Sequence, residues 1–166
     1  MTYITHCDSP VGTLLLASDG ENLIGLWLEG QKHYGNGLDD AVVTEDSLPI
    51  FSRTKRWLEA YFAGEQPSIE GLPLAPGGSE FRRRICRLMC EIPYGELTTY
   101  GQLAKDYEVR FGQKTSARAV GGAVGRKPIS ILIPCHRVVG AGGITGYAGG
   151  LDKKRILLEL EGITGY

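Results

Sequence analysis

The sequence lacks a run of about 18 apolar residues, the minimum for a membrane-spanning helix, and it lacks the charged-then-apolar leader of a secretory signal. We therefore expect a soluble, intracellular protein that does not contact a membrane. Its 166 residues, of which 42% are hydrophobic and 22% charged, have an ordinary globular composition. The chain is long enough to bury a core, as one domain or as two small lobes.

Cysteine and histidine are both scarce. The four cysteines include no Cys-x-x-Cys pair, which argues against a disulfide scaffold and favours reduced thiols. Cys86 and Cys90 lie one helical turn apart, a spacing that suits two packing positions in a core. His6, Cys7 and His33 could ligate a metal, but no fourth ligand follows at a recognisable spacing, so we expect no metal.

A strong net charge is also missing, because the whole chain carries only -1 at neutral pH. This small value hides an asymmetry. Residues 1–79 contain 4 Lys and Arg against 11 Asp and Glu, whereas residues 80–166 contain 14 against 8. The two parts therefore carry -7 and +6, and this difference suggests that the second part faces a polyanion.

The first part of the chain has the pattern of strands followed by one helix. Residues 2–28 contain short apolar or alternating stretches between turns, which predicts an antiparallel hairpin or meander. Residues 30–47 are polar and glycine-rich, which predicts a loop. Large apolar side chains at helical spacing over residues 51–62 predict a helix that packs on the strands.

A linker separates this lobe from the rest of the chain. Residues 67–78 contain three prolines and three glycines without periodicity, which indicates irregular structure. We therefore divide the chain into a domain of residues 1–78, linker included, and a domain of residues 79–166.

The second domain is predicted to be mostly helical. The elements expected in order are a helix from Ser79 to about residue 90, a helix capped by Thr98 or Thr99 that runs through Ala104, a helix over about 115–124, a buried strand over 129–133, a glycine-rich loop over 140–150 and a last helix over 151–161. The second and third helices, joined by a turn, have the pattern of a helix-turn-helix.

Positive charge gathers around this helix pair. Between Val109 and Lys127 there are five basic residues and no acidic one, so the later helix would present positive charge to a phosphate backbone. The run Arg82-Arg83-Arg84 has two interpretations: a solvated helix face, which is the commoner case, or a further phosphate contact.

Cys135 has chemically suggestive neighbours. An apolar stretch leads to Pro134, and the thiol is followed at once by His136 and Arg137. A cysteine near cations is more easily ionised and therefore more reactive. Because free cysteine is among the most buried residue types, a structural thiol in the core stays open as the alternative.

Five segments in order, with two residues beyond them, carry a resemblance to a known family. They are Ile92-Pro93-Tyr94-Gly95-Glu96, Thr99-Tyr100-Gly101-Gln102-Leu103-Ala104, Arg118-Ala119-Val120-Gly121, Ile133-Pro134-Cys135-His136-Arg137-Val138 and Thr145-Gly146-Tyr147-Ala148-Gly149-Gly150-Leu151, followed by Lys154 and Glu161. Together they resemble the O6-alkylguanine-DNA alkyltransferases, also called methylated-DNA–protein-cysteine methyltransferases. The resemblance spans about residues 79–162, and residues 1–78 match the family's smaller amino-terminal lobe in outline.

This resemblance implies an α+β fold and a single-use repair reaction. The fold would combine a small lobe of antiparallel strands and a helix with a mostly helical domain that carries a winged helix-turn-helix-like element. Cys135 would take the alkyl group irreversibly from a flipped-out O6-alkylguanine, with O4-alkylthymine as a further substrate, and no cofactor would be needed. His136 would accept the thiol proton through water and Glu161 would orient His136. Tyr100 would support base rotation and protonation, and Lys154 would lie near the site.

The resemblance also implies how substrate and DNA are held. Backbone groups of Cys135, Val138 and Ala148 would bind the guanine, and Tyr147 would wall the pocket. Arg118 would fill the gap left in the duplex. The predicted DNA contacts are Thr99, Tyr100, Lys114, Arg118, Ala119, Gly121 and Arg137. The partner would be double-stranded DNA bound through its minor groove without sequence preference, a monomer would suffice, and the compartment would be the cytoplasm, at the nucleoid in a prokaryote, or the nucleus in a eukaryote.

Two features depart from the family pattern. Lys127 precedes Pro128 where the family usually has asparagine, which affects the link between the DNA-binding helix and the active-site turn. Residues 104–116 are about four residues longer than is common, so we expect a reshaped turn between the two helices.

Two other functions stay open. The first is a sensor that binds alkylated bases without transfer and recruits other repair factors; the presence of Cys135 argues against it, because non-transferring relatives have lost that cysteine. The second is a cysteine hydrolase that uses Cys135 and His136, for which the DNA-linked segments would be a coincidence.

Overall fold

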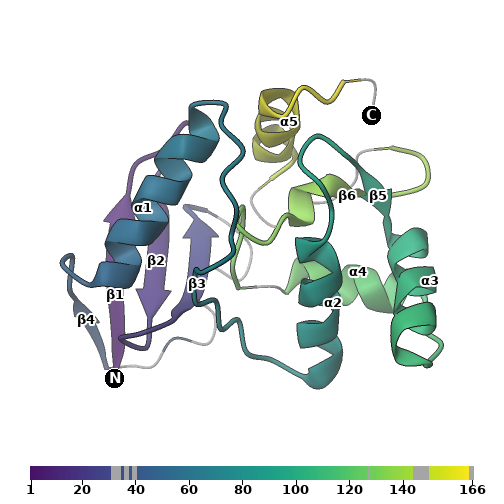
Figure 1. Cartoon of the computed structure of the whole chain (residues 1–166), viewed down its shortest axis with the longest axis horizontal. Helices are drawn as coiled ribbons and strands as arrows, with labels where there is room; N and C mark the ends of the chain where they lie inside the picture. The colour runs from purple at the N-terminus through teal and green to yellow at the C-terminus, as the bar shows by residue number, and fades with distance from the viewer. Residues whose placement is uncertain (31–34, 36–37, 39–40, 127, 144–149, 165–166) are drawn as a thin grey trace. The chain divides into compact units, whose positions relative to one another are not determined.

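The computed structural model describes residues 1–30, 35, 38, 41–126, 128–143 and 150–164. The chain forms two compact units, Met1–Gly77 with Pro128–Ser130, and Gly78–Lys127 with Ile131–Tyr166 (Figure 1). Over the described ranges, no helix is both long and apolar enough to span a membrane. Sheet and helices together give the α+β class predicted from the sequence.

The first unit is built on a four-stranded sheet. Its strands are β1 (Thr2–Cys7), β2 (Leu14–Ser18), β3 (Leu23–Leu28) and β4 (Val42–Thr44). The strand order is β3-β2-β1-β4, with β1 and β4 parallel and the other neighbours antiparallel. The expectation of a loop throughout residues 30–47 is therefore wrong at β4. This strand is an exposed edge strand of three residues, too short for an alternating pattern to mark it.

Helix α1 (Pro49–Phe62) packs against β2 and covers one face of the sheet (Figure 1). Its first residue is proline, which has no N–H to leave unsatisfied at a helix start. Trp27 lies in a cluster of buried residues with Leu15 and Ala17. Gly25 makes room for that tryptophan, since a Cβ at this position would lie 2.1 Å from the indole ring.

The segment Pro128–Ser130 belongs to the first unit, at β3. Leu26 N donates to Pro128 O at 2.7 Å, and Ser130 N donates to Leu26 O at 3.0 Å. The strand predicted over residues 129–133 is wrong, because only Ile129 forms a bridge and the backbone turns at Ile131, where φ is 69°. The residues are buried as the pattern indicated, but an apolar run does not by itself specify a ladder.

The second unit contains the other helices. They are α2 (Glu80–Cys90), α3 (Tyr100–Phe111), α4 (Ala117–Gly125) and α5 (Leu151–Leu160). A hydroxyl caps each of the first three: Ser79 accepts from Arg82 N, Thr99 from Gln102 N and Ser116 from Ala119 N. Each cap satisfies one backbone N–H that the first helical turn leaves without a partner.

The long segment between the predicted helices is itself mostly helix. Residues 105–111 extend α3 to Gly112, which ends it in the left-handed conformation with φ 69°. The polar stretch expected between the two helices is therefore mostly helical, and residues 112–116 form the turn. Glycine suits this cap because its αL conformation costs no Cβ clash.

Helices α3 and α4 pack against each other and against α2, as expected for a helix-turn-helix (Figure 1). Gly121 on α4 faces Tyr100, where a Cβ would lie 3.8 Å from the ring. Directly before Tyr100, the short strand β5 (Thr98–Thr99) pairs in parallel with β6 (Val138–Val139). This pairing connects the start of α3 to the segment that follows Cys135.

Candidate active site

Cys135 begins a single 3-10 turn, η1 (Cys135–Arg137), that follows Pro134. We call η1 the thiol turn. Arg137 N donates to Pro134 O at 3.0 Å, which closes the turn. Val138 continues directly into β6. The residue Cys135 is 5% exposed, so its burial alone fits both a reactive and a structural thiol. The groups around the turn must decide between them.

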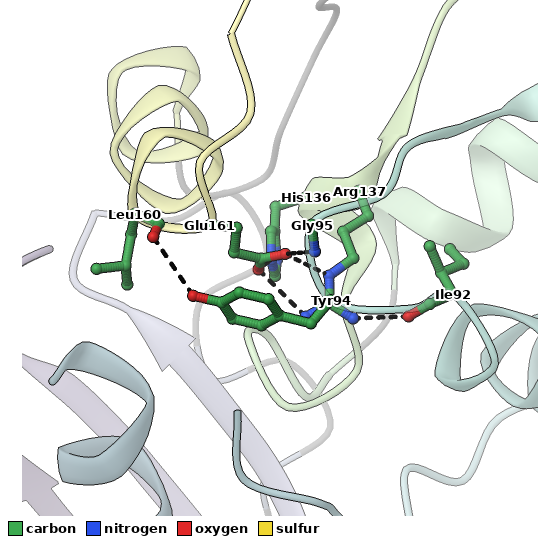
Figure 2. Close-up of polar contacts among 7 residues, drawn as sticks. All are labelled: Ile92, Tyr94, Gly95, His136, Arg137, Leu160 and Glu161. Atoms are coloured by element: carbon green, nitrogen blue, oxygen red, sulfur yellow. Dashed lines mark hydrogen bonds and ion pairs between the residues drawn. The ribbon is translucent and has the colours of Figure 1, made fainter. Parts of the chain in front are cut away.

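A buried polar cluster lies beside the thiol turn and centres on Glu161, the residue after α5 (Figure 2). His136 Nε2 lies 2.6 Å from Glu161 Oε2. Arg137 donates from Nε to Oε1 at 2.8 Å and from Nη2 to Oε2 at 3.2 Å. Gly95 N donates to Oε1 at 3.0 Å. We call these four residues the Glu161 cluster.

Arg137 extends the cluster toward the connection between α2 and β5. Its Nη1 donates to Ile92 O at 2.7 Å, and its guanidinium lies 5.6 Å from the centre of the Tyr94 ring. The Tyr94 hydroxyl donates to Leu160 O at 3.3 Å (Figure 2). Burial, and then the negative charge of Glu161, raise the pKa of Tyr94 above its usual value. Tyr94 therefore remains a neutral donor at physiological pH.

The position of Arg137 does not support its predicted contact with DNA. Its side chain is 10% exposed, and Nε, Nη1 and Nη2 all donate to groups inside the second unit. A phosphate contact would have to compete with a buried carboxylate for the same N–H groups. We therefore treat Arg137 as part of the Glu161 cluster, and its contact with DNA stays a prediction.

Lys154 approaches the thiol turn from α5. The residue is fully buried, and Nζ donates to Val138 O at 2.6 Å. Burial lowers the pKa of this lysine from 10.5 to about 8, while interaction with Cys135 acts in the opposite direction. The structure thus brings Lys154, Val138 and Cys135 together.

Other predicted residues lie on the helix pair. Lys114, Arg118 and Ala119 are exposed, whereas Thr99, Tyr100 and Gly121 are half-buried. The exposed residues lie at or just before the start of α4, where a nucleic acid could reach them. Tyr147 and Ala148, predicted to contact the substrate, lie outside the described residues, as do Lys127 and His33.

The thiol turn has the parts of a nucleophilic cysteine site. Three N–H donors from Arg137 and Gly95 point at the Glu161 carboxylate, which favours its ionised form. An ionised Glu161 accepts a hydrogen from His136 Nε2, so Nδ1 is the basic nitrogen of the neutral ring. A thiol, a base and a group that orients the base form the arrangement used to activate cysteine.

Sequence reasoning missed the backbone groups of this site. Gly95 N–H and Ile92 C=O hold Glu161 and Arg137, yet a backbone group leaves no trace in residue type. The only available signal was the segment Ile92-Pro93-Tyr94-Gly95-Glu96, which carried the resemblance without an assigned role.

Among the residues that the structure describes, no group of three or more side chains could hold a metal ion.

Comparison with known families gives two adjoining matches. Residues 80–163 match the family described as "6-O-methylguanine DNA methyltransferase, DNA binding domain". Residues 2–76 match "6-O-methylguanine DNA methyltransferase, ribonuclease-like domain". The two matches cover nearly the whole chain.

Individual proteins are similar over a comparable length. The methylated-DNA–protein-cysteine methyltransferase of Haemophilus influenzae is 44% identical over 162 residues, covering 97% of this chain and 87% of that protein. The protein of the same name from Methanosarcina acetivorans is 45% identical, covering 96% and 98%. The crystal structure of Mycobacterium tuberculosis OGT in complex with DNA aligns with a TM-score of 0.83 and 39% identity, covering 96% and 92%.

Proposed function

Because this chain belongs to the O6-methylguanine-DNA methyltransferase family, as its sequence motifs predicted, we propose that it repairs alkylated DNA through its own Cys135. The activity is that of a methylated-DNA–protein-cysteine methyltransferase. One observation carries the assignment of the acceptor: Cys135 is followed by His136, whose imidazole lies 2.6 Å from the buried Glu161 carboxylate.

The proposed reaction is a displacement at the alkyl carbon. Cys135 Sγ attacks that carbon, a new S–C bond forms, and the bond from the carbon to O6 of guanine breaks. The thiol proton passes through water to His136, and the released guanine takes up a proton. Because the thioether is stable, each protein molecule acts once and needs no cofactor.

His136 and Glu161 have distinct roles in this proposal. Glu161 holds His136 through Nε2, so Nδ1 can receive the proton that leaves the thiol. As His136 becomes an imidazolium, the adjacent carboxylate stabilises its positive charge, which lowers the barrier to forming the thiolate. Sequestering both groups from water strengthens their interaction.

Lys154, Val138 and Tyr100 complete the side of the site that the structure describes. Lys154 donates to Val138 O, so it would position the backbone that binds the guanine. Tyr100, at the start of α3, would assist rotation of the base and protonation of the released guanine. Val138, Tyr147 and Ala148 would bind the O6-alkylated guanine. O4-alkylthymine would be a further substrate.

The exposed start of α4 is the proposed DNA-binding surface. Arg118 would fill the gap left by the flipped base, which offsets part of the cost of unstacking. Ala119 and Gly121 would permit close approach to the minor groove, and Lys114 and Thr99 would contact the backbone. Such contacts carry no sequence preference. We further propose that the protein acts as a monomer in the compartment that holds the genome, the cytoplasm and nucleoid of a prokaryote or the nucleus of a eukaryote.

Intact mass spectrometry tests the proposal directly. The protein is mixed with a duplex that contains one O6-methylguanine, and we expect a gain of one methyl group that peptide mapping places on Cys135. Cys135→Ser should show no gain and should still bind the duplex. Cys86→Ser is the matched control, because Cys86 is a buried thiol on α2 to which we assign no role in transfer, and it should transfer normally.

Two results would reject the assignment. Methylation of Cys135→Ser would place the acceptor elsewhere. An unchanged mass for the wild type, together with tight binding to the lesion, would favour a sensor that recognises alkylated bases without transfer.

A further inference from the structure

Arg137 follows the proposed acceptor and base in sequence, yet neither proposed role uses it. Its guanidinium is buried and donates to Glu161 and to Ile92. Resting on the proposed function, we infer that Arg137 is a positioning residue for proton transfer: it fixes the orientation and the negative charge of Glu161, through which it acts on His136.

The geometry of the ion pair supports this role. Arg137 meets Glu161 with two nearly parallel bonds, one to each carboxylate oxygen. Oε1 also accepts from Gly95 N and Oε2 also contacts His136 Nε2, so both oxygens have two partners. The last torsion of a glutamate is normally broad, but rotation here would break several bonds at once. The orientation of Oε2 toward His136 is therefore set largely by Arg137.

The electrostatics point the same way. Glu161 follows the last residue of α5, and the carbonyl groups at the end of a helix place partial negative charge near a carboxylate. Burial adds a further penalty against ionisation. Within the part of the chain that the structure describes, His136, Arg137 and Tyr94 face this carboxylate, and Arg137 carries a permanent positive charge. Lys154 lies on α5 near Cys135, so its charge acts on the thiol side of the site.

Arg137 also connects this pair to the segment that leads into the DNA-binding helices. Nη1 holds Ile92 O, and Gly95 N holds the same carboxylate from the end of that segment. Three residues after Gly95, β5 begins and pairs with β6 beside the thiol turn. The guanidinium thus anchors Glu161 to backbone at a fixed distance from the turn that carries Cys135.

The test compares Arg137→Met with Arg118→Ala on two substrates. One is duplex DNA with O6-methylguanine and the other is the free base O6-methylguanine. For Arg137→Met we expect the rate to fall about 100-fold on both, the scale of a general base that is lost or misaligned, with duplex affinity unchanged. Arg118→Ala should be slower on the duplex alone, because only the duplex leaves a gap to fill.

The pH dependence of the rate on the free base gives a second readout. Without the guanidinium, His136 and its partners hold protons more tightly, so the acidic limb of the profile should move to higher pH in Arg137→Met. The limb should stay in place in Arg118→Ala. Arg137→Lys keeps the charge but loses the two parallel bonds, so it should lower the rate with little movement of the limb.

The inference is overturned if Arg137→Met loses duplex affinity or duplex rate but reacts normally with the free base, since Arg137 would then be a DNA contact. It is also overturned if the rate falls only in proportion to the unfolded fraction and the limb does not move. If Arg137→Met does not fold, Arg137→Lys decides: an unchanged rate on the free base rejects the role. If the wild type takes a methyl group from neither substrate, that result would instead reject the proposed function.

Discussion

The two units bury different kinds of polar side chains. In the first unit the buried polar residues that the structure describes are Thr2, Thr5, Ser18, Thr54 and Ser130, none of which carries a charge. In the second unit they are His136, Arg137, Lys154 and Glu161, all of which are ionisable. A buried hydroxyl needs one hydrogen bond, which Thr54 makes to Ile50 O at 2.8 Å. A buried charge needs an opposite charge and several bonds.

This difference separates scaffold from site. Replacing a buried ion pair by apolar residues often costs nothing, so the pair in the second unit does not explain the stability of the fold. Clustered, buried, ionisable groups are instead typical of places where protons or charges move. The burial of ionisable side chains nearby, more than the burial of the thiol itself, distinguishes the proposed acceptor Cys135 from Cys86 on α2.

The largest effect expected on this contrast comes from Glu161→Ala. Removing the carboxylate leaves Arg137 as a buried charge without its partner, which costs about 3 to 5 kcal/mol of unfolding free energy. The matched variant in the first unit is Asp46→Ala, an exposed carboxylate that accepts from Thr5 Oγ1 at 2.6 Å. Losing that bond should cost about 1 kcal/mol. Urea unfolding of both variants measures the difference, and equal losses would remove the distinction between the units.

A smaller effect is expected from the charge of Lys154. The pKa of Lys154 is about 8 in the folded protein, against an ordinary value of 10.5. Between these two pH values the unfolded chain therefore binds more protons than the folded one. Stability contributed through this residue therefore rises as the pH increases from 8 to 10. Lys154→Met removes the contribution, and the stability difference between wild type and variant should move in favour of wild type over that range. A difference that is constant with pH would contradict a depressed pKa.

The helices of the second unit show which features of the fold can be predicted from the sequence. Ser79 and Thr99 were predictable caps, because a hydroxyl stands before an apolar helical pattern. The end of α3 was not, since residues 105–111 contain charged side chains on exposed faces and read as a polar turn. Local pattern identifies a helix start well, but its length depends on packing against α2 and α4.

The residues of the candidate site also differ in how far the sequence predicted them. Cys135 and His136 adjoin in sequence and suggested their chemistry directly, whereas Glu161, 25 residues from His136, entered only through the family resemblance. The destination of Arg137 could not be predicted, because an arginine beside a reactive thiol suits a phosphate contact as well as a buried ion pair. Tertiary structure chose the second by placing Glu161 and the Ile92 carbonyl around it.

The smallest expected effect concerns how helices begin in the two units. Helix α1 has no side-chain cap, whereas Ser116 caps α4 by accepting from Ala119 N at 3.0 Å. Ser116→Ala should cost about 1 kcal/mol of unfolding free energy. Ser47→Ala, near the start of α1, is the matched control, because the Ser47 hydroxyl donates to Glu45 rather than to the helix, and it should cost less.

Because Arg118 lies in the first turn of α4, fraying at Ser116 should also weaken duplex binding without changing the rate on free O6-methylguanine. Titration with undamaged duplex and a rate assay on the free base would separate the two effects. A loss on the free base would mean that the start of α4 also holds the active-site turn, through the close approach of Gly121 to Tyr100. Full duplex affinity would instead mean that packing on α3, rather than the cap, sets where α4 begins.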